Sequence, residues 1–136
     1  MKQSDVPQCI ELWKTTGMRI AAFEREKKEC LAMLKMNYTS CFVAISDKKI
    51  IGSVFGTFNG RRGWIYHLAV HNNWQKKGIG LLLMEKTEQA LAKQKVTKII
   101  LAVHISNLKV IPFYEKLGYV IMPDALLFEK GLSGNK

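Results

Sequence analysis

The stretch "WQKKGIGLLL", residues 74–83, joins a short apolar run to a segment with helical periodicity. Its two glycines, Gly78 and Gly80, stand where the predicted helix begins, near Leu81. A helix N-terminus carries unpaired N–H groups and a partial positive charge, and glycines there let a phosphate approach the backbone. We therefore predict an anion-binding turn whose natural ligand is a diphosphate. Three neighbouring side chains add donors and charge: Gln75, Lys76 and Lys77.

Short β-rich runs precede this turn. They are "CFVAIS" (41–46), "IIGSVFGTF" (50–58) and "WIYHLAV" (64–70). Asp47-Lys48-Lys49 separates the first two, and Asn59-Gly60 separates the last two, and both sequences suit tight turns. The pattern predicts an antiparallel meander of three strands.

Helices are predicted on both sides of the meander. One spans about residues 4–17, with Ser4 or Asp5 as its cap and Gly17 at its end, and a second spans residues 23–36. The helix after the glycine turn has one apolar face, made of Leu83, Thr87, Ala90 and Leu91.

The remaining segments predict two strands and a short helix. "KIILAV" (98–103) is a continuous apolar run typical of a buried strand, "VIPFYEKLG" (110–118) is a helix closed by Gly118, and "ALLFEK" (125–130) suits a last strand. The order predicts an α/β fold in which helices flank a mixed, mostly antiparallel central sheet. The length suits a single domain over residues 1–136.

Composition narrows the function classes. The formal net charge is +10, which favours anionic ligands, but the basic residues are scattered and form no nucleic-acid-binding motif. No apolar run approaches the roughly 18 residues of a spanning helix, and the N-terminus lacks the apolar region of a signal peptide. We expect a soluble cytoplasmic protein that binds neither nucleic acid nor membrane.

The cysteines and histidines predict no metal site. Cys9, Cys30 and Cys41 have no metal-ligand spacing and are expected to be buried thiols. The histidines also lie far from these cysteines in the sequence, at no spacing typical of a zinc site: His67, His71 and His104.

Two known phosphate-binding patterns are absent from the turn. A dinucleotide fingerprint needs a third glycine where Leu83 stands, and the P-loop sequence does not occur. The pattern present, Gln-x-x-Gly-x-Gly, resembles the pyrophosphate-binding motif of the GNAT superfamily of N-acetyltransferases. A second motif of that family is similar to "NLKVIPFYEKLGY", residues 107–119. The resemblance covers about residues 4–130, although Asn72 stands where a proline usually follows His71. The family's first strand has no counterpart before the first helix, so that strand is either missing or lies upstream of Met1.

The resemblance implies acetyl-CoA as acetyl donor and a primary amine as acceptor, joined by direct attack in a ternary complex. Tyr114 would be the general acid that protonates the departing sulfur, because a tyrosine is protonated at neutral pH. Asn107 would either bind the coenzyme arm or cap its helix. Strand amides would bind the pantetheine arm and the thioester oxygen. The full cofactor-binding set implied is Leu68, Ala69, Val70, Gln75, Lys76, Lys77, Gly78, Ile79, Gly80, Leu81, Asn107, Phe113 and Tyr114.

The general base is not assigned. Many relatives have a glutamate where this chain has Tyr66, and strand alternation is expected to turn His67 to the face opposite Tyr66 and Leu68. A relay through water is an alternative, as are three carboxylates of the second predicted helix: Glu24, Glu26 and Glu29.

A second hypothesis is a non-catalytic module that binds acyl-CoA as a sensor or an interaction domain. The charge disfavours a polycationic acceptor unless four carboxylates gather into a patch: Glu11, Glu24, Glu26 and Glu29. Small amines, amino acids and a protein N-terminus remain open as acceptors, and a homodimer is compatible with the resemblance.

Overall fold

The three predicted strands form the centre of a four-stranded sheet. They are β1 (Cys41–Ser46), β2 (Lys49–Phe58) and β3 (Gly63–Val70), and each pairs antiparallel with the next. A short strand, β4 (Ile99–Leu101), runs parallel to β3, so the order is β1-β2-β3-β4. The predicted mixed, mostly antiparallel sheet is confirmed.

The structure is a computed structural model that describes residues 1–133. The chain divides into two units, Met1–Ala102 and Val103–Lys136, and each is described by itself. The first unit contains the whole sheet, and the second contains the segment with the second predicted motif. Among residues 1–133, no helix is both long and apolar enough to cross a bilayer.

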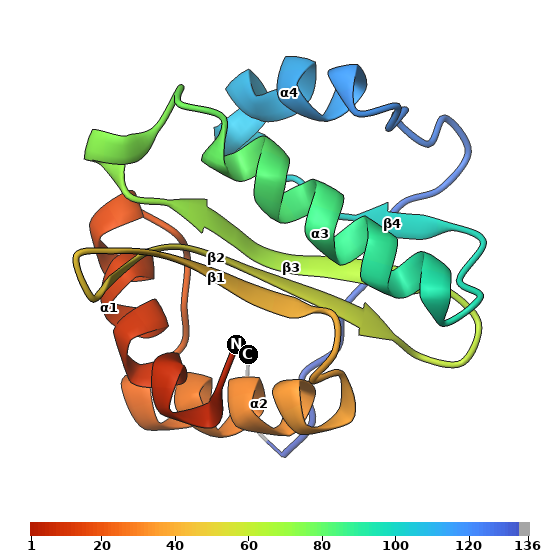
Figure 1. Cartoon of the computed structure of the whole chain (residues 1–136). Helices are drawn as coiled ribbons and strands as arrows, with labels where there is room; N and C mark the ends of the chain where they lie inside the picture. Colours follow the sequence, from red (N-terminus) through yellow and green to blue (C-terminus); the bar gives the residue numbers. More distant parts are fainter. Residues whose placement is uncertain (134–136) are drawn as a thin grey trace. The chain divides into compact units, whose positions relative to one another are not determined.

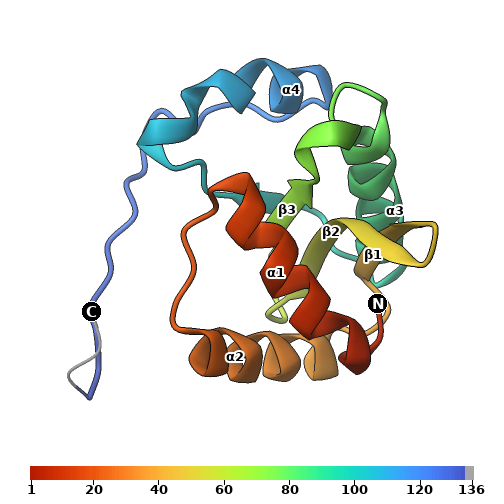
Figure 2. The ribbon, with the colours of Figure 1, turned by 90° about the vertical axis from the view of Figure 1, so that its left-hand side faces the viewer.

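Helices cover both faces of the sheet in the first unit (Figures 1 and 2). After a single 3-10 turn, η1 (Gln3–Asp5), helix α1 (Val6–Thr16) packs with α2 (Phe23–Met36) against one face. The core of this face contains Trp13 and Phe55, both fully buried, with ring centroids 6.0 Å apart. The opposite face is covered by α3.

Helix α3 (Ile79–Lys93) packs closely because glycines of the sheet lie beneath it. A Cβ at Gly52 would lie 3.0 Å from Leu83 Cδ1. A Cβ at Gly56 would overlap the Thr87 hydroxyl, which donates a hydrogen bond to the carbonyl oxygen of Ser40. The backbone of β2 therefore fixes how near α3 can lie.

Replacing Gly56 with alanine is expected to destabilise the fold. The added methyl group would meet Thr87 and would lie 2.7 Å from the carbonyl oxygen of Ser40, so helix and strand must separate. Overpacking of this kind costs about 2–3 kcal/mol. Urea unfolding measures this loss of free energy of unfolding. The double variant with Thr87→Ala should recover only part of the loss because the carbonyl oxygen remains, and an unchanged unfolding midpoint for Gly56→Ala would contradict this account.

The structure differs from the sequence predictions at two strands, one shorter than predicted and one absent. The predicted strand 98–103 shortens to β4, whose residues are only half-buried. The predicted strand 125–130 is wrong: these residues have no regular structure, and Leu126 and Phe128 are exposed. A strand needs a hydrogen-bonded neighbour, and β-rich composition alone does not supply one.

The first helix lies close to its predicted position, as α1 (Val6–Thr16) follows directly after η1. No strand precedes α1 among the described residues, and the N-terminal ammonium of Met1 donates to the carbonyl oxygen of Cys41 at 3.0 Å. Asp5 occupies the cap position of α1, but its carboxylate accepts from the backbone of Lys2 instead of capping the helix. Gly17 ends α1 with a φ of 76°.

Candidate functional site

The glycine turn is open to solvent. A 3-10 turn, η2 (Asn72–Trp74), follows β3, and α3 begins directly after Gly78, which has a φ of 84°. No side chain caps the first N–H groups of α3, and a Cβ at Gly78 would meet nothing within 4 Å. Because these amides face open space, they can bind an anion directly.

The side chains of the turn hold it against β3. Nε2 of Gln75 donates to the carbonyl oxygen of Val70 at 3.0 Å and to Oδ1 of Asn72 at 3.2 Å. The Lys77 ammonium lies 5.1 Å from the centre of the Trp74 ring. Gln75 therefore positions the turn, whereas the exposed amino groups of Lys76 and Lys77 provide its positive charge.

Within residues 1–102, the outer edge of β3 has no strand partner beyond its first three residues. Strand β4 pairs only with Gly63–Ile65, so within residues 1–102 no strand covers the edge from Tyr66 onward. The amide of His71 donates to Ile51 of β2, and the alternation of an antiparallel ladder turns the N–H of its neighbour Val70 to the open edge. The same alternation turns the N–H of Ala69 toward β2, so of these two residues only Val70 presents its N–H at the outer edge.

A β-bulge interrupts β3 beside this edge. Ser53 of β2 lies opposite Ala69, but Phe55 lies opposite Tyr66, so β3 contains one extra residue at His67–Leu68. His67 has a φ of 52°, in the left-handed region.

The bulge reverses the predicted direction of His67. Gly56 faces α3, and Ile65 opposite it shares that face, so regular alternation would also turn His67 toward α3. Instead, His67 lies on the face covered by α1 and α2, where the centroid of its ring is 4.2 Å from the centroid of the Trp13 ring. The prediction that His67 and Tyr66 point to opposite faces is wrong.

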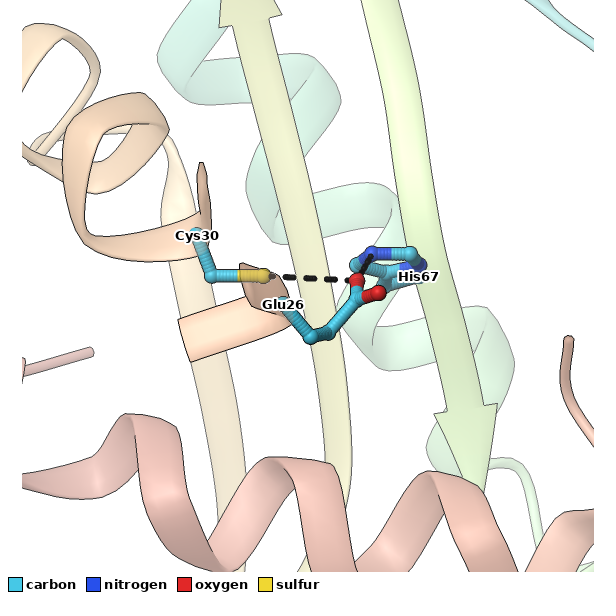
Figure 3. A group of neighbouring side chains, drawn as sticks. All are labelled: Glu26, Cys30 and His67. Atoms are coloured by element: carbon cyan, nitrogen blue, oxygen red, sulfur yellow. Dashed lines mark hydrogen bonds and ion pairs between the residues drawn. The ribbon is translucent and has the colours of Figure 1, made fainter. Parts of the chain in front are cut away.

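On that face, His67 is part of a buried polar cluster (Figure 3). Its Nε2 lies 2.9 Å from Oε1 of Glu26, and the other carboxylate oxygen of Glu26 accepts from the backbone N–H of Ala21 at 2.7 Å. The thiol of Cys30, one turn along α2, lies 3.8 Å from Oε1. The buried carboxylate of Glu26 thus joins the strand, the helix and the loop between α1 and α2.

Burial sets the protonation of the cluster. Removal from water lowers the pKa of His67 below its ordinary 6.5, against the smaller opposite effect of Glu26, so the ring is neutral at pH 7. Burial raises the pKa of Cys30 to about 12, and the nearby Glu26 carboxylate acts in the same direction. The cluster therefore contains a neutral imidazole and an undissociated thiol.

The bulge itself is held by a buried hydroxyl. Ser53 accepts from Nε1 of Trp13 at 2.8 Å and donates to the carbonyl oxygen of His67 at 2.8 Å. The side chain of one β2 residue thereby connects α1 to the irregular part of β3.

Replacing Ser53 with alanine is expected to lower the free energy of unfolding by about 2–4 kcal/mol, because two buried polar groups, on Trp13 and His67, lose their partner. Chemical unfolding measures the change. Ser4→Ala, which removes an exposed hydroxyl, serves as the control. Equal stability of the two variants would contradict the account.

Glu26, Cys30 and His67 also offer three ligand atoms within 4.8 Å of one another. A soft divalent metal could be held by such a set. Binding would require loss of the thiol proton and of the Glu26–His67 hydrogen bond, and the pKa of about 12 for Cys30 opposes the first. Cys30 and His67 are far apart in the sequence, so their spacing did not predict that they lie in one cluster.

The second unit contains the other predicted site residues. A 3-10 segment, η3 (Ile105–Val110), leads into α4 (Ile111–Lys116). The Tyr114 ring contacts the rings of Phe113 and Tyr119, with centroids 5.1 and 5.9 Å away. Burial raises the pKa of Tyr114 above its ordinary 10.0, so its hydroxyl is protonated at neutral pH.

Asn107 lies within η3 and not at its N-terminus, and its two predicted roles stay predictions. His104 is the cap residue of η3, and its ring accepts from the amide of Ser106, while α4 begins after Val110. Asn107 instead lies at a kink, with a φ of −124° and a ψ of 33°.

Comparison with known proteins agrees with these features. The Acetyltransferase (GNAT) family matches residues 2–119. The chain belongs to the GNAT family of acetyltransferases. An acetyltransferase of Pectobacterium atrosepticum is 31% identical over 118 residues, which are 87% of this chain and 83% of that protein. An acetyltransferase of Sodalis glossinidius is 29% identical over 131 residues, 96% of this chain and 92% of the relative.

A solved structure shares the fold of this GNAT chain. A predicted acetyltransferase from Clostridium acetobutylicum, crystallised with acetyl-CoA, superposes with a TM-score of 0.77 at 14% identity. The match covers 95% of this chain and 92% of that one.

A hollow on the surface of this GNAT chain lies away from the glycine turn. It has a volume of about 420 Å³ between one side of α1, Phe23 and the start of β2, and it reaches His71. Neither His67 nor Gly78 lines it, so this hollow includes neither the buried cluster nor the glycine turn.

Proposed function

We propose that this acetyltransferase moves the acetyl group of acetyl-CoA to a primary amine of a small molecule or peptide, by direct attack in a ternary complex. The observation that carries the proposal is the uncapped, solvent-open N-terminus of α3, which follows a strand, β3, whose outer edge has no strand partner from Tyr66 onward within residues 1–102.

The turn fits the pyrophosphate of acetyl-CoA. Backbone N–H groups would bind it, the left-handed Gly78 leaves room for it, and the two exposed lysines would add charge. The set assigned to this task is Gln75, Lys76, Lys77, Gly78, Ile79, Gly80 and Leu81, with Gln75 acting through its bond to Val70.

The free edge of β3 fits the extended arm of the coenzyme. Val70 presents its N–H there, and Leu68 lies within the bulge. An amide donor aimed at the thioester oxygen stabilises the negative charge that develops in the transition state, by about 3 kcal/mol. From the second unit, we assign Tyr114 as the acid that protonates the sulfur, and Asn107 and Phe113 to coenzyme contacts.

The charges around α1 and α2 favour an acceptor that is not polycationic. Glu11 pairs with Lys14 at 3.1 Å, Glu29 pairs with Arg25 at 3.0 Å, and Glu26 is buried against His67. Three of the four carboxylates that could have formed an acidic patch are therefore already engaged.

Release of free coenzyme A thiol, followed over a panel of primary amines, tests the proposal, with acetyl-CoA affinity measured separately by calorimetry. We expect saturable binding and turnover on at least one amine. Binding without turnover on any amine would favour an acyl-CoA sensor instead, and absence of binding would reject both.

A further inference from the structure

We propose that His67 is the general base that deprotonates the acceptor amine, with Glu26 as the residue that positions it. The inference rests on the proposed function, because it assigns a role in the same acetyl transfer. Neither residue belongs to the coenzyme-binding turn.

The tautomer of His67 is set by its partner. The Glu26 carboxylate accepts a hydrogen bond, so the proton of the neutral ring lies on Nε2 and the lone pair lies on Nδ1. Within residues 1–133, Nδ1 has no hydrogen-bond partner, yet no buried side-chain nitrogen or oxygen in this range lacks one. Nδ1 must therefore reach solvent, consistent with a His67 side chain that is 22% exposed.

The position of the ring suits attack from the face of the sheet. His67 follows the point where β3 separates from β4, and it directly precedes Leu68. A thioester held at the open edge would be approached by an amine from the face of α1 and α2, where His67 lies. The bulge is what places the ring on this face.

Glu26 holds the ring in this position. The Glu26 side chain is 8% exposed, and its carboxylate is also fixed by the amide of Ala21, in the loop between α1 and α2. A carboxylate in this position orients an imidazole and stabilises the imidazolium that forms when it accepts a proton.

The reaction balances as follows. Nδ1 of His67 takes one proton from the acceptor ammonium and later releases it to solvent. The neutral nitrogen forms a bond to the acetyl carbon, the carbon–sulfur bond breaks with its electron pair on sulfur, and the sulfur gains a proton from Tyr114. The second proton of the amine restores the Tyr114 hydroxyl, so the products are the amide, the free thiol of coenzyme A and one proton.

The test uses His67→Asn, because asparagine tolerates a left-handed φ and keeps a polar group toward Glu26 but is no base. The substrate is the alkylamine that the wild type acetylates fastest, compared with its β,β-difluoro analogue, whose lower amine pKa makes a far larger fraction of the amino group neutral at pH 7. We expect kcat/KM at pH 7 to fall about 100-fold for the alkylamine and to stay close to wild type for the fluorinated amine. The deficit should also shrink at high pH, where free amine is abundant.

The pH profile gives an independent readout. The titratable groups that face His67 are Glu26 and Cys30 of α2, whereas its neighbours from α1 and β2 are the rings of Trp13 and Phe55. A base must be neutral, so wild-type kcat/KM should fall as pH falls through the lowered pKa of His67, below 6.5. Glu26→Gln removes the charge that raises this pKa, so the acidic limb should move to lower pH and turnover should drop about tenfold.

Each remaining outcome counts against the proposal. If kcat/KM of His67→Asn falls equally for both amines and at every pH, His67 has a structural role. Unchanged kcat/KM in this variant would exclude His67 as the base. Loss of wild-type activity in a chelator would assign the cluster to a metal instead. A wild type without turnover on any amine would reject the proposed function itself. The control is His104→Asn, which keeps a capping residue, and thermal unfolding and acetyl-CoA affinity of each variant separate folding from chemistry.

Discussion

Gly78→Asp should weaken acetyl-CoA binding about 100-fold while leaving the protein folded. The new carboxylate would stand at the uncapped N-terminus of α3, in the space where a pyrophosphate would bind. A 100-fold loss corresponds to about 2.7 kcal/mol, a plausible sum of charge repulsion and loss of the backbone contact. Calorimetry with acetyl-CoA measures the affinity.

Stability and affinity should change independently in this variant. Aspartate at an N-cap stabilises a helix by about 1 kcal/mol, which offsets much of the strain of a left-handed φ of 84°. An affinity loss together with a nearly unchanged unfolding midpoint would therefore exclude misfolding as its cause.

Two matched variants separate charge from shape at this position. Gly78→Asn has nearly the same size and tolerance for a left-handed φ but no charge, so its loss of affinity should be about tenfold. Gly60→Asp makes the same chemical change in a hairpin turn with a φ of 91°, where an added Cβ also meets open space. We expect it to bind acetyl-CoA like the wild type, and equal losses at Gly60 and Gly78 would contradict an anion site at the turn.

Features set by neighbouring residues could be predicted from the sequence. Helix α2 has the predicted bounds, and the turn between β1 and β2 places Asp47 and Lys48 at left-handed φ values of 49° and 63°. The glycine turn belongs to this group, because the end of a strand and the start of a helix are both encoded locally. The failed strand at residues 125–130 depends on a distant partner, which composition does not specify.

The Glu26–His67 pair could not be predicted from strand alternation. The bulge arises from the register between β2 and β3, so the sequence of β3 alone predicts the wrong face for His67. One signal was present in α2, where Phe23, Glu26, Cys30 and Leu34 form one stripe. Cys30 and Leu34 are core residues, so a carboxylate on the same stripe had to be buried and therefore had to find a partner.

Tyr114→Phe should lower turnover about 100- to 1,000-fold with less than a twofold change in acetyl-CoA affinity. The substitution removes only the hydroxyl, which we propose protonates the departing sulfur, and general acids contribute factors of this size. The ring and its contacts with Phe113 and Tyr119 remain, so packing in the second unit is preserved. Steady-state thiol release and calorimetry measure the two quantities.

The alkaline side of the wild-type pH profile follows from the same residue. A general acid must be protonated, so activity should be lost only as pH rises through the pKa of Tyr114, which burial raises above 10.0. We therefore expect no alkaline limb below pH 10 from this group, whereas the acidic limb belongs to His67.

Tyr119→Phe is the matched control, because it removes a hydroxyl from the neighbouring ring of the same aromatic group. If Tyr114 acts only by packing, the two variants should have similar and small effects on turnover. If it acts as the acid, only Tyr114→Phe should lose the chemical step while both retain acetyl-CoA binding. Unchanged turnover in Tyr114→Phe would transfer protonation of the sulfur to solvent, and an equal loss of affinity and turnover would make Tyr114 a coenzyme contact instead of an acid.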